Sequence, residues 1–369
     1  MPELAEQIEE LLGEAEDLDH GPVQLALVER AVELADAHNE LDVSFHARMT
    51  LVEAAIFSDR PDIALVAFSW LLSKFDAEPD RFDSFQLLWS YKWILGHVAN
   101  FPSIPKDRID DLFDDMKRRY KAEGSTLHAY WSLRRDNAQT MGDKAGAKKA
   151  NAKLLSTPRD HLSNCLACVQ DGNVDLYAFL DDDAAAVQAA KPILSGKMAC
   201  SIVPECTYAG VVLSYIRLGK PARAMECFET GYRLIGRQST YLSQKAKYIV
   251  GLTLTDNLSR AVKLLDRHLP EALDSVDPSA EFEFYLAARL LLETLSENGK
   301  KTVPIRIPKK MELAGGDGKP AVAVIVDWLD ARLKVLATAF DARNGNKSFA
   351  KRLKNFRDLF QYAKPCPLK

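Results

Sequence analysis

Four cysteines in one stretch of the chain have the residue type and spacing of a metal site. Cys165 and Cys168 form a C-x-x-C motif, and Cys200 and Cys206 follow further along the chain. Four thiolates fill the tetrahedral shell that zinc prefers, and a shell of sulfur alone is typical of a structural rather than a catalytic site. The four cysteines therefore predict a structural Zn²⁺ site, with His161 as a reserve ligand if Cys206 points into a helix interface.

Two other interpretations of these cysteines stay open. Cysteine packs like a small apolar residue, so the four side chains could be buried free thiols at helix contacts. The C-x-x-C pair could also form a disulfide or take part in redox chemistry, although no βαβ pattern of the thioredoxin kind surrounds it. Of the remaining two cysteines, Cys227 is expected in the core and Cys366 lies in the C-terminal tail.

The stretch that carries the cysteines also contains a pattern of paired helices. Large residues recur at helical spacing from Tyr208, Gly219 breaks this helix, and Pro221 suits the start of the next one. The second helix combines small residues, which allow close helix contact, with a large residue that fills the space between them; these are Ala224, Gly231 and Phe228. The pattern predicts a helix, a tight turn and a second helix that packs closely on the first.

The same pattern recurs at intervals of 37 to 39 residues along much of the chain. An alanine marks the close-contact position of the second helix in each copy, at Ala26, Ala64, Ala147, Ala186, Ala224 and Ala261. A residue that suits a tight turn separates the two helices, at Gly21, Asp59, Gly142, Asp181, Gly219 and Asp256. Between the second and third of these alanines, a degenerate copy fits residues 82–122.

The repeat also explains why the four cysteines are expected to converge. Cys168 precedes Tyr177 by nine residues, and Cys206 precedes Tyr215 by nine, so the two cysteines occupy equivalent places in adjacent copies. First helices of adjacent copies are expected side by side, at roughly 10 Å. The sequence therefore predicts that the four thiols meet at one edge of the stacked helix pairs.

These motifs resemble the tetratricopeptide-repeat (TPR) superfamily over roughly residues 3–275. The resemblance implies an all-α fold, a right-handed TPR-like α-solenoid of about seven antiparallel helix pairs, whose concave face binds a protein or a peptide. The C-x-x-C motif, followed by Cys200 and the Pro-x-x-x-Tyr segment from Pro204 to Tyr208 with Thr207 within it, also resembles a family of bacterial TPR-like proteins. That second resemblance implies no activity.

The C-terminal part, residues 276–369, does not follow the repeat. A long amphipathic helix is predicted at 278–298, and a helical hairpin at 320–342 and 347–362. The segment 300–318 between them contains prolines, β-branched residues and a glycine-rich run, which predict an extended linker or surface flap. We expect residues 1–275 to form the repeats and residues 276–369 to form a helical cap with this flap.

Composition narrows the class of protein. The net charge is −4, which disfavours nucleic acid as a partner. The sequence has no apolar run of about 18 residues, so no membrane-spanning helix is expected. The N-terminal sequence lacks a basic region followed by an apolar one, and the six cysteines do not form a secreted disulfide framework. These features predict a cytoplasmic protein.

No motif in the chain points to catalysis. A glycine-rich phosphate loop, a G-x-S-x-G and an H-E-x-x-H are all missing from the sequence. The first hypothesis is therefore a non-enzymatic scaffold that binds a protein or peptide, with a structural zinc between two repeats. The alternatives are a regulator gated by a ligand or peptide, in which the 300–318 flap is the gate, and an enzyme that depends on a metal or a thiol.

Overall fold

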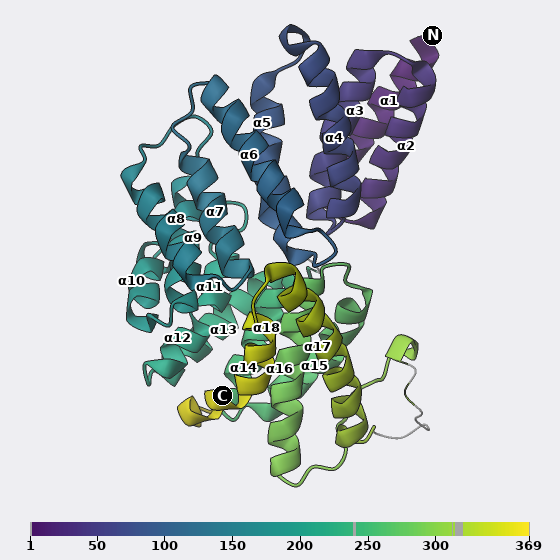
Figure 1. The fold of residues 1–369 in the computed structure, drawn as a ribbon. Coiled ribbons are helices and arrows are strands. Elements are labelled where there is room, and N and C mark those ends of the chain that lie inside the picture. Colours follow the sequence, from purple (N-terminus) through teal and green to yellow (C-terminus); the bar gives the residue numbers. More distant parts are fainter. Residues whose placement is uncertain (1, 239–240, 312, 314–319, 369) are drawn as a thin grey trace. The chain divides into compact units, whose positions relative to one another are not determined.

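The computed structural model describes residues 2–238, 241–311, 313 and 320–368. Regular structure in these residues is helical, and their extended pairings are two isolated bridges, Cys200 with Val203 and Thr302 with Ala321 (Figure 1). The prediction of an all-α fold is confirmed. Among the described residues, no helix combines the length and apolar character needed to cross a bilayer.

The chain divides into two compact units, and the first comprises residues 2–99, 107–133 and 154–163. The helices that lie wholly or mostly in it are α1 (Pro2–Glu16), α2 (Pro22–His38), α3 (Leu41–Phe57), α4 (Pro61–Ala77), α5 (Ser84–His97) and α6 (Lys106–Ala122). Consecutive helices from α1 to α5 pack on one another, and α3 also contacts α1 and α5.

The second unit comprises residues 100–106, 134–153 and 164–368. Its helices are α9 (Leu166–Phe179), α10 (Asp183–Leu194), α11 (Glu205–Gly210), α12 (Val212–Arg217), α13 (Pro221–Ile235), α14 (Leu242–Leu254), α15 (Leu258–Asp274), α16 (Pro278–Glu297), α17 (Val322–Asn344) and α18 (Ser348–Asn355). Here α9 contacts both α10 and α11, and α14 contacts α12, α13, α15 and α16. Two helices, α7 (His128–Thr140) and α8 (Lys144–Ser156), contribute residues to both units.

One turn recurs between the paired helices and shares its geometry from copy to copy. Five of the six predicted turn residues have a left-handed φ between 57° and 75°: Asp59, Gly142, Asp181, Gly219 and Asp256. In each case the next N–H donates to the carbonyl five residues before it, at 2.7–2.9 Å, which closes the preceding helix in a Schellman motif. The sixth residue, Gly21, has an extended backbone with φ 161°. Glycine and aspartate are used here because they tolerate a left-handed φ better than other residues do.

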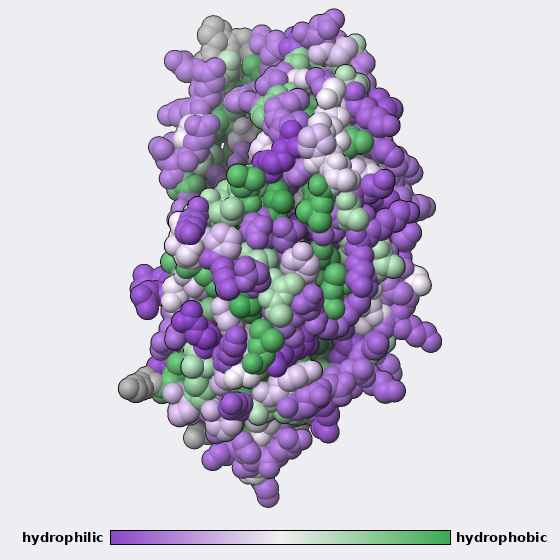
Figure 2. Space-filling model, turned by 90° about the vertical axis from the view of Figure 1, so that its left-hand side faces the viewer, coloured by the Kyte–Doolittle hydropathy of each residue, from purple (hydrophilic) through white to green (hydrophobic). Residues whose placement is uncertain are grey.

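The close-contact alanines are buried in all but the first copy. Five of the six are fully inaccessible to solvent: Ala64, Ala147, Ala186, Ala224 and Ala261. Ala26 is exposed, whereas its neighbour Leu25 is buried. Leu25 follows the first proline of α2 by three residues, as Ala64 and Ala224 follow the first prolines of α4 and α13. The predicted register of the first copy is therefore wrong by one residue. Hydrophilic residues cover most of the face drawn in Figure 2.

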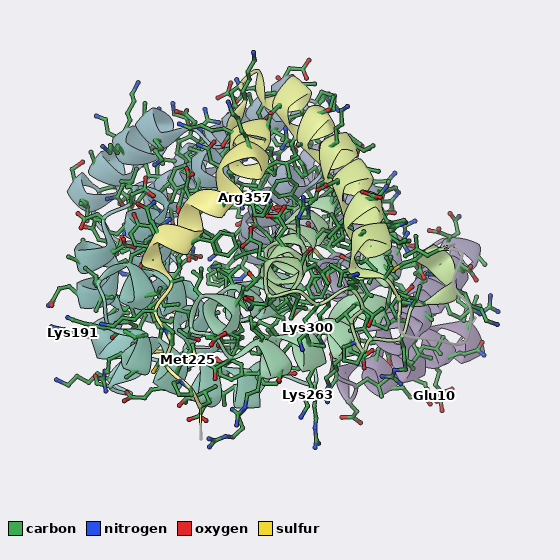
Figure 3. All side chains as sticks on the ribbon, turned by 90° about the horizontal axis from the view of Figure 1, so that it is seen from below. Glu10, Lys191, Met225, Lys263, Lys300 and Arg357 are labelled. Carbon is green, nitrogen blue, oxygen red and sulfur yellow. The ribbon has the colours of Figure 1, made fainter. Side chains whose placement is uncertain are left out.

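Two predicted helices are divided in the structure. The helix expected around Tyr208 and before the break at Gly219 is interrupted at Val211, which separates α11 from α12. The helix expected at 347–362 ends as α18 at Asn355 and continues as a 3₁₀ helix, Phe356–Tyr362. Arg357 in this last turn, labelled in Figure 3, donates to both carboxylate oxygens of Glu293 on α16 at 2.7 and 2.8 Å.

The predicted flap at 300–318 falls partly outside the described residues, which include only 300–311 and 313 of it. In the described part Val303, Ile305 and Met311 are buried. The Val303 N–H donates to the Pro320 carbonyl at 3.1 Å. Residues 312 and 314–318 of the expected 300–318 gate lie outside the described residues, so the gate stays a prediction. The division of the chain after residue 275 stays a prediction too.

The C-terminal tail pairs with the end of α14. The Lys364 N–H donates to the Leu254 carbonyl at 2.9 Å, and the Cys366 N–H donates to the Thr255 carbonyl at 3.0 Å. The side-chain amide of Asn257 donates to the Cys366 carbonyl at 2.9 Å. The tail therefore satisfies carbonyl groups that a helix end leaves without intrahelical partners.

Candidate metal centre

Three of the four predicted ligands converge in the second unit. The Sγ atoms of Cys165, Cys168 and Cys200 all lie within 4.8 Å of one another. Sulfur atoms that bind one zinc ion at about 2.3 Å from tetrahedral corners stand about 3.8 Å apart. The separation of the three thiols is therefore compatible with a shared metal ion. Small rotations of the cysteine side chains would bring the three sulfurs to bonding distance.

The first two thiols are positioned by the start of α9. Cys165 is the N-cap residue of this helix, and its Sγ accepts a hydrogen bond from the Cys168 N–H at 3.3 Å. A thiolate at this position also faces the positive end of the helix dipole. The C-x-x-C spacing thus places two sulfurs on one side of the first helical turn, where backbone donors favour negative charge.

The third thiol is positioned by a tight turn before α11. The Cys200 N–H donates to the Val203 carbonyl at 2.9 Å, and the Val203 N–H donates back to Cys200 at 3.3 Å. Val203 is fully buried and packs in a small cluster with Ala167 and Ile193. Because this cluster also includes Cys168, it holds the turn against the start of α9 and brings Cys200 to the C-x-x-C motif.

Two of the three thiols, Cys165 and Cys168, differ in acidity. Burial by itself would raise the pKa of Cys165, but hydrogen bonds from the Cys168 N–H, the Cys168 thiol and the Cys200 thiol outweigh it and lower that pKa. Burial raises the pKa of Cys168, and its hydrogen bond to Cys165 raises it further. Of these two thiols, Cys165 is therefore the one that favours the thiolate form, and a bound cation would favour deprotonation of Cys168 as well.

Cys206, the fourth predicted ligand, does not belong to this group. Its side chain packs against the core between the helices, and its Sγ accepts a hydrogen bond from the Gln244 side chain of α14 at 3.4 Å. Burial raises the pKa of Cys206 to about 12, and the carboxylates of Asp171 and Asp175 add to the shift. The prediction of a four-cysteine site is corrected to three, because the second residue of α11 faces the helix interface.

The reserve ligand and the other cysteines lie elsewhere. His161 belongs to the first unit, where its ring stacks on Phe85 with centroids 6.2 Å apart. Cys227 is buried on α13, as expected, and Cys366 is half-buried in the tail. Among the described residues, no fourth His, Cys, Asp or Glu side chain joins the three thiols.

Exposure around the three thiols is a feature that the sequence prediction missed. Cys165 and Cys200 are exposed, and Cys168 is half-buried. Two large apolar residues adjacent to them in sequence are also exposed, Leu166 at 60% and Ile202 at 43%. The sequence contained a signal for these exposed apolar residues, which form a rim around the thiols. Leu166 lies inside the C-x-x-C motif, and Ile202 directly follows Cys200 and Ser201.

A line of charged residues on α7, α9 and α14 was not predicted either. Lys247 of α14 lies 3.6 Å from an Asp175 carboxylate oxygen, and both side chains are more than two-fifths exposed. Asp136 of α7 is 42% exposed, yet burial raises its pKa. The Asp175 carboxylate adds to this rise in the pKa of Asp136, so the three charged groups influence one another.

The three thiols can hold one thiophilic metal ion through sulfur alone, with ligands from two segments about 30 residues apart in sequence. Such a metal would join the start of α9 to the turn before α11. The whole chain matches no protein-family model. No curated protein matches it at a significant level either.

Proposed function

We propose that this chain is a helical-repeat scaffold that binds a protein or peptide and carries a zinc ion at Cys165, Cys168 and Cys200. The observation that carries the proposal is the convergence of these three sulfurs from two separate segments. Thiolate ligands select soft or borderline ions, and among these zinc is the one that takes structural roles without redox chemistry.

The scaffold part of the proposal is supported by the recurrence of the turns and contacts. The shared left-handed turn residues recur at intervals of 37 to 39 residues from Gly142 to Asp256. Helices two apart in sequence contact each other, as α9 with α11 and α14 with α16 do. Both features are those of an α-solenoid with TPR-like antiparallel pairs, whose concave surface serves protein or peptide binding.

The zinc ion would have a structural role in this scaffold. The turn from Cys200 to Val203 is held by two backbone hydrogen bonds and by one buried side chain, Val203. A metal that joins this turn to Cys165 and Cys168 would fix the spacing of α9 and α11. Metal binding to thiolates also matches a reducing compartment, so we place the protein in the cytoplasm.

The test is the zinc content of protein purified without a polyhistidine tag. We expect about one zinc per chain, and less than about a tenth of an equivalent would contradict the proposal. Cys200→Ser should lower zinc affinity at least about 100-fold, because it removes a direct ligand. Cys206→Ser and Cys366→Ser are matched controls that should keep the metal. Loss of zinc in Cys206→Ser would restore the four-cysteine site.

The scaffold itself is tested by affinity capture from the native host with mass spectrometry. Substitution of Lys247 by Glu reverses the charge of the α14 member of the charged residues on α7, α9 and α14, and it should weaken capture of a specific partner. A protein that captures no partner, or the same partners with Lys247→Glu, would contradict binding at this surface.

A further inference from the structure

The zinc site of the proposed function, on which this inference rests, is incomplete within the described residues. Zinc in structural sites takes four protein ligands. The group contains three sulfurs, and Cys206 is withdrawn into the interface with α14. Two of the three cysteines are exposed. A metal held by the three sulfurs would therefore have one coordination position left for a ligand from outside this group.

We propose that a second copy of this chain completes the site, with Cys200 of each copy bridging two zinc ions. Each zinc would keep the three sulfurs of its own chain and gain the bridging sulfur of the other. Two chains supply six thiolates, and two tetrahedra that share an edge need six corners. The stoichiometry of three cysteines per chain is thus satisfied without any further ligand.

Cys200 is the thiol best placed to bridge. Cys165 already accepts the Cys168 N–H, and Cys168 is half-buried beside Ala167 and Val203. Cys200 is exposed on a tight turn, and its Sγ has one polar neighbour in its own segment, the Ser201 hydroxyl at 4.0 Å. A bridging sulfur needs a second lone pair directed outward, which this position offers.

The surroundings of the thiols suit a contact between identical surfaces. Leu166 and Ile202 flank the exposed sulfurs and are themselves exposed. In a two-fold symmetric contact each apolar side chain meets the same patch on the other copy, so the rim is complementary to itself. Burial of these side chains would add to the metal–sulfur bonds and would exclude water from the bridged ions.

The assembly balances in atoms and charge. Each Zn²⁺ displaces three thiol protons from one chain and forms a site with a net charge of −1. Joining two such sites forms two new zinc–sulfur bonds and breaks none other than bonds to water, and the pair carries a charge of −2. No oxidant or additional ligand is required.

The experiment measures the mass of the full-length protein with and without zinc. The chain mass is 41.1 kDa. Metal-free protein in a phosphine reductant should sediment as a monomer at micromolar concentration, and one equivalent of zinc should double the mass. A chelator should reverse the change. Full-length protein that stays monomeric with one zinc bound would overturn this inference and leave the proposed function standing, whereas absence of zinc binding would remove both.

A matched pair of variants tests the contact without touching a ligand. Ile202→Arg keeps all three thiols and adds no zinc ligand. In the symmetric contact it would place an arginine of one chain opposite the same arginine of the other chain. It should weaken dimerisation by about ten- to a hundredfold at unchanged zinc content. Leu234→Arg, at the similarly exposed residue of α13 (41%), should leave the dimer intact. Equal effects of the two substitutions would argue against a contact at the thiols.

Cobalt substitution tests the bridge itself. Bridged cobalt ions couple antiferromagnetically, which weakens their EPR signal. At about a tenth of an equivalent of cobalt most bound ions are isolated, so the EPR signal per cobalt should fall as loading rises from there to one equivalent. A constant signal would exclude the bridge. If the fourth ligand of a monomeric cobalt protein disappears in His161→Ala, the chain's own imidazole completes the site, and the inference is wrong.

Discussion

Gly231 on α13 offers a sharp test of how closely the helices of the second unit approach. A Cβ atom at this position would lie 1.9 Å from the Tyr248 hydroxyl oxygen and 2.5 Å from the Tyr208 Cβ. Real side chains do not approach so closely, and the Tyr208 Cβ cannot move without its backbone. Gly231→Ala should therefore force α13 away from α11 and α14.

The size of the effect follows from two opposing contributions. Alanine in place of a helical glycine gains about 1 kcal/mol of helix propensity. Overpacking of a well-packed site costs typically about 1–3 kcal/mol, and a clash with an atom next to the backbone belongs at the upper end. We expect Gly231→Ala to lower the free energy of unfolding by about 2 kcal/mol.

Two further variants provide the controls. At Gly210, the last residue of α11, a Cβ would meet its nearest neighbours at 3.4 and 3.7 Å, which are ordinary contacts. Gly210→Ala should therefore be neutral or stabilising. Tyr248→Phe removes the nearest clashing atom, a buried hydroxyl without a hydrogen-bond partner among the described residues, and should recover part of the loss when combined with Gly231→Ala.

Urea unfolding followed by circular dichroism measures the stability of these variants. Hydrogen exchange of the α13 and α14 amides localises the effect to the second unit, which matters because two units need not unfold together. A Gly231→Ala protein as stable as the parent would refute the close approach of α11, α13 and α14 described above.

Three other predictions concern titratable groups. Hydrogen bonds from Ser125 and Thr126 outweigh burial and hold the pKa of Asp160 at about 2, below its ordinary value. The carboxylate should therefore stabilise the fold above about pH 4, and this stabilisation should be lost towards pH 2. In Asp160→Asn, the free energy of unfolding in urea should no longer show this part of the fall with acid. Burial, with the neighbouring Asp175 carboxylate, raises the pKa of Asp171 to about 7, so the folded state binds a proton that the unfolded state releases. Stability should fall by up to about 1.4 kcal/mol per pH unit between about pH 4 and 7, and Asp171→Asn should stabilise the protein at pH 8 but not at pH 4 in urea titrations. In metal-free protein, iodoacetamide should modify the exposed Cys165 before the buried Cys227, whose pKa burial raises to about 12; peptide mass spectrometry that found the reverse order would contradict the described exposures.

The features of the fold that depend on local chemistry could be read from the sequence. Gly219 and Asp181 were predictable as turn residues because few other residue types tolerate a left-handed backbone. Pro221 and the buried Ala224 were predictable from the start of a helix and its close contact. The close-contact position of the first copy was wrongly assigned to Ala26, because an alanine was favoured over the neighbouring Leu25. In the structure, the buried residues of the copies that begin with proline share their distance from that proline instead.

The candidate site shows where sequence reasoning stops. The C-x-x-C motif fixed Cys165 and Cys168 in one helical turn. The repeat predicted a meeting of all four thiols from the equivalence of Cys168 and Cys206, whereas the structure brings only Cys200 to the pair. Cys206 failed because the direction of its side chain depends on how α11 begins, and α11 is interrupted at Val211. The offset of nine residues from each cysteine to its tyrosine gives equivalent positions only if the helix between them is continuous. Tertiary packing, which single-sequence patterns do not contain, decided the rest.

The pairing of the C-terminal tail with the end of α14 matters for anyone who shortens this chain. Residues 364–366 resemble a frayed terminus in sequence, with two prolines and two lysines nearby, and would be natural to trim from an expression clone. Their backbone nonetheless supplies donors to Leu254 and Thr255. A clone that stops before Lys364 would expose the end of α14 to water and leave these carbonyl groups without their backbone donors.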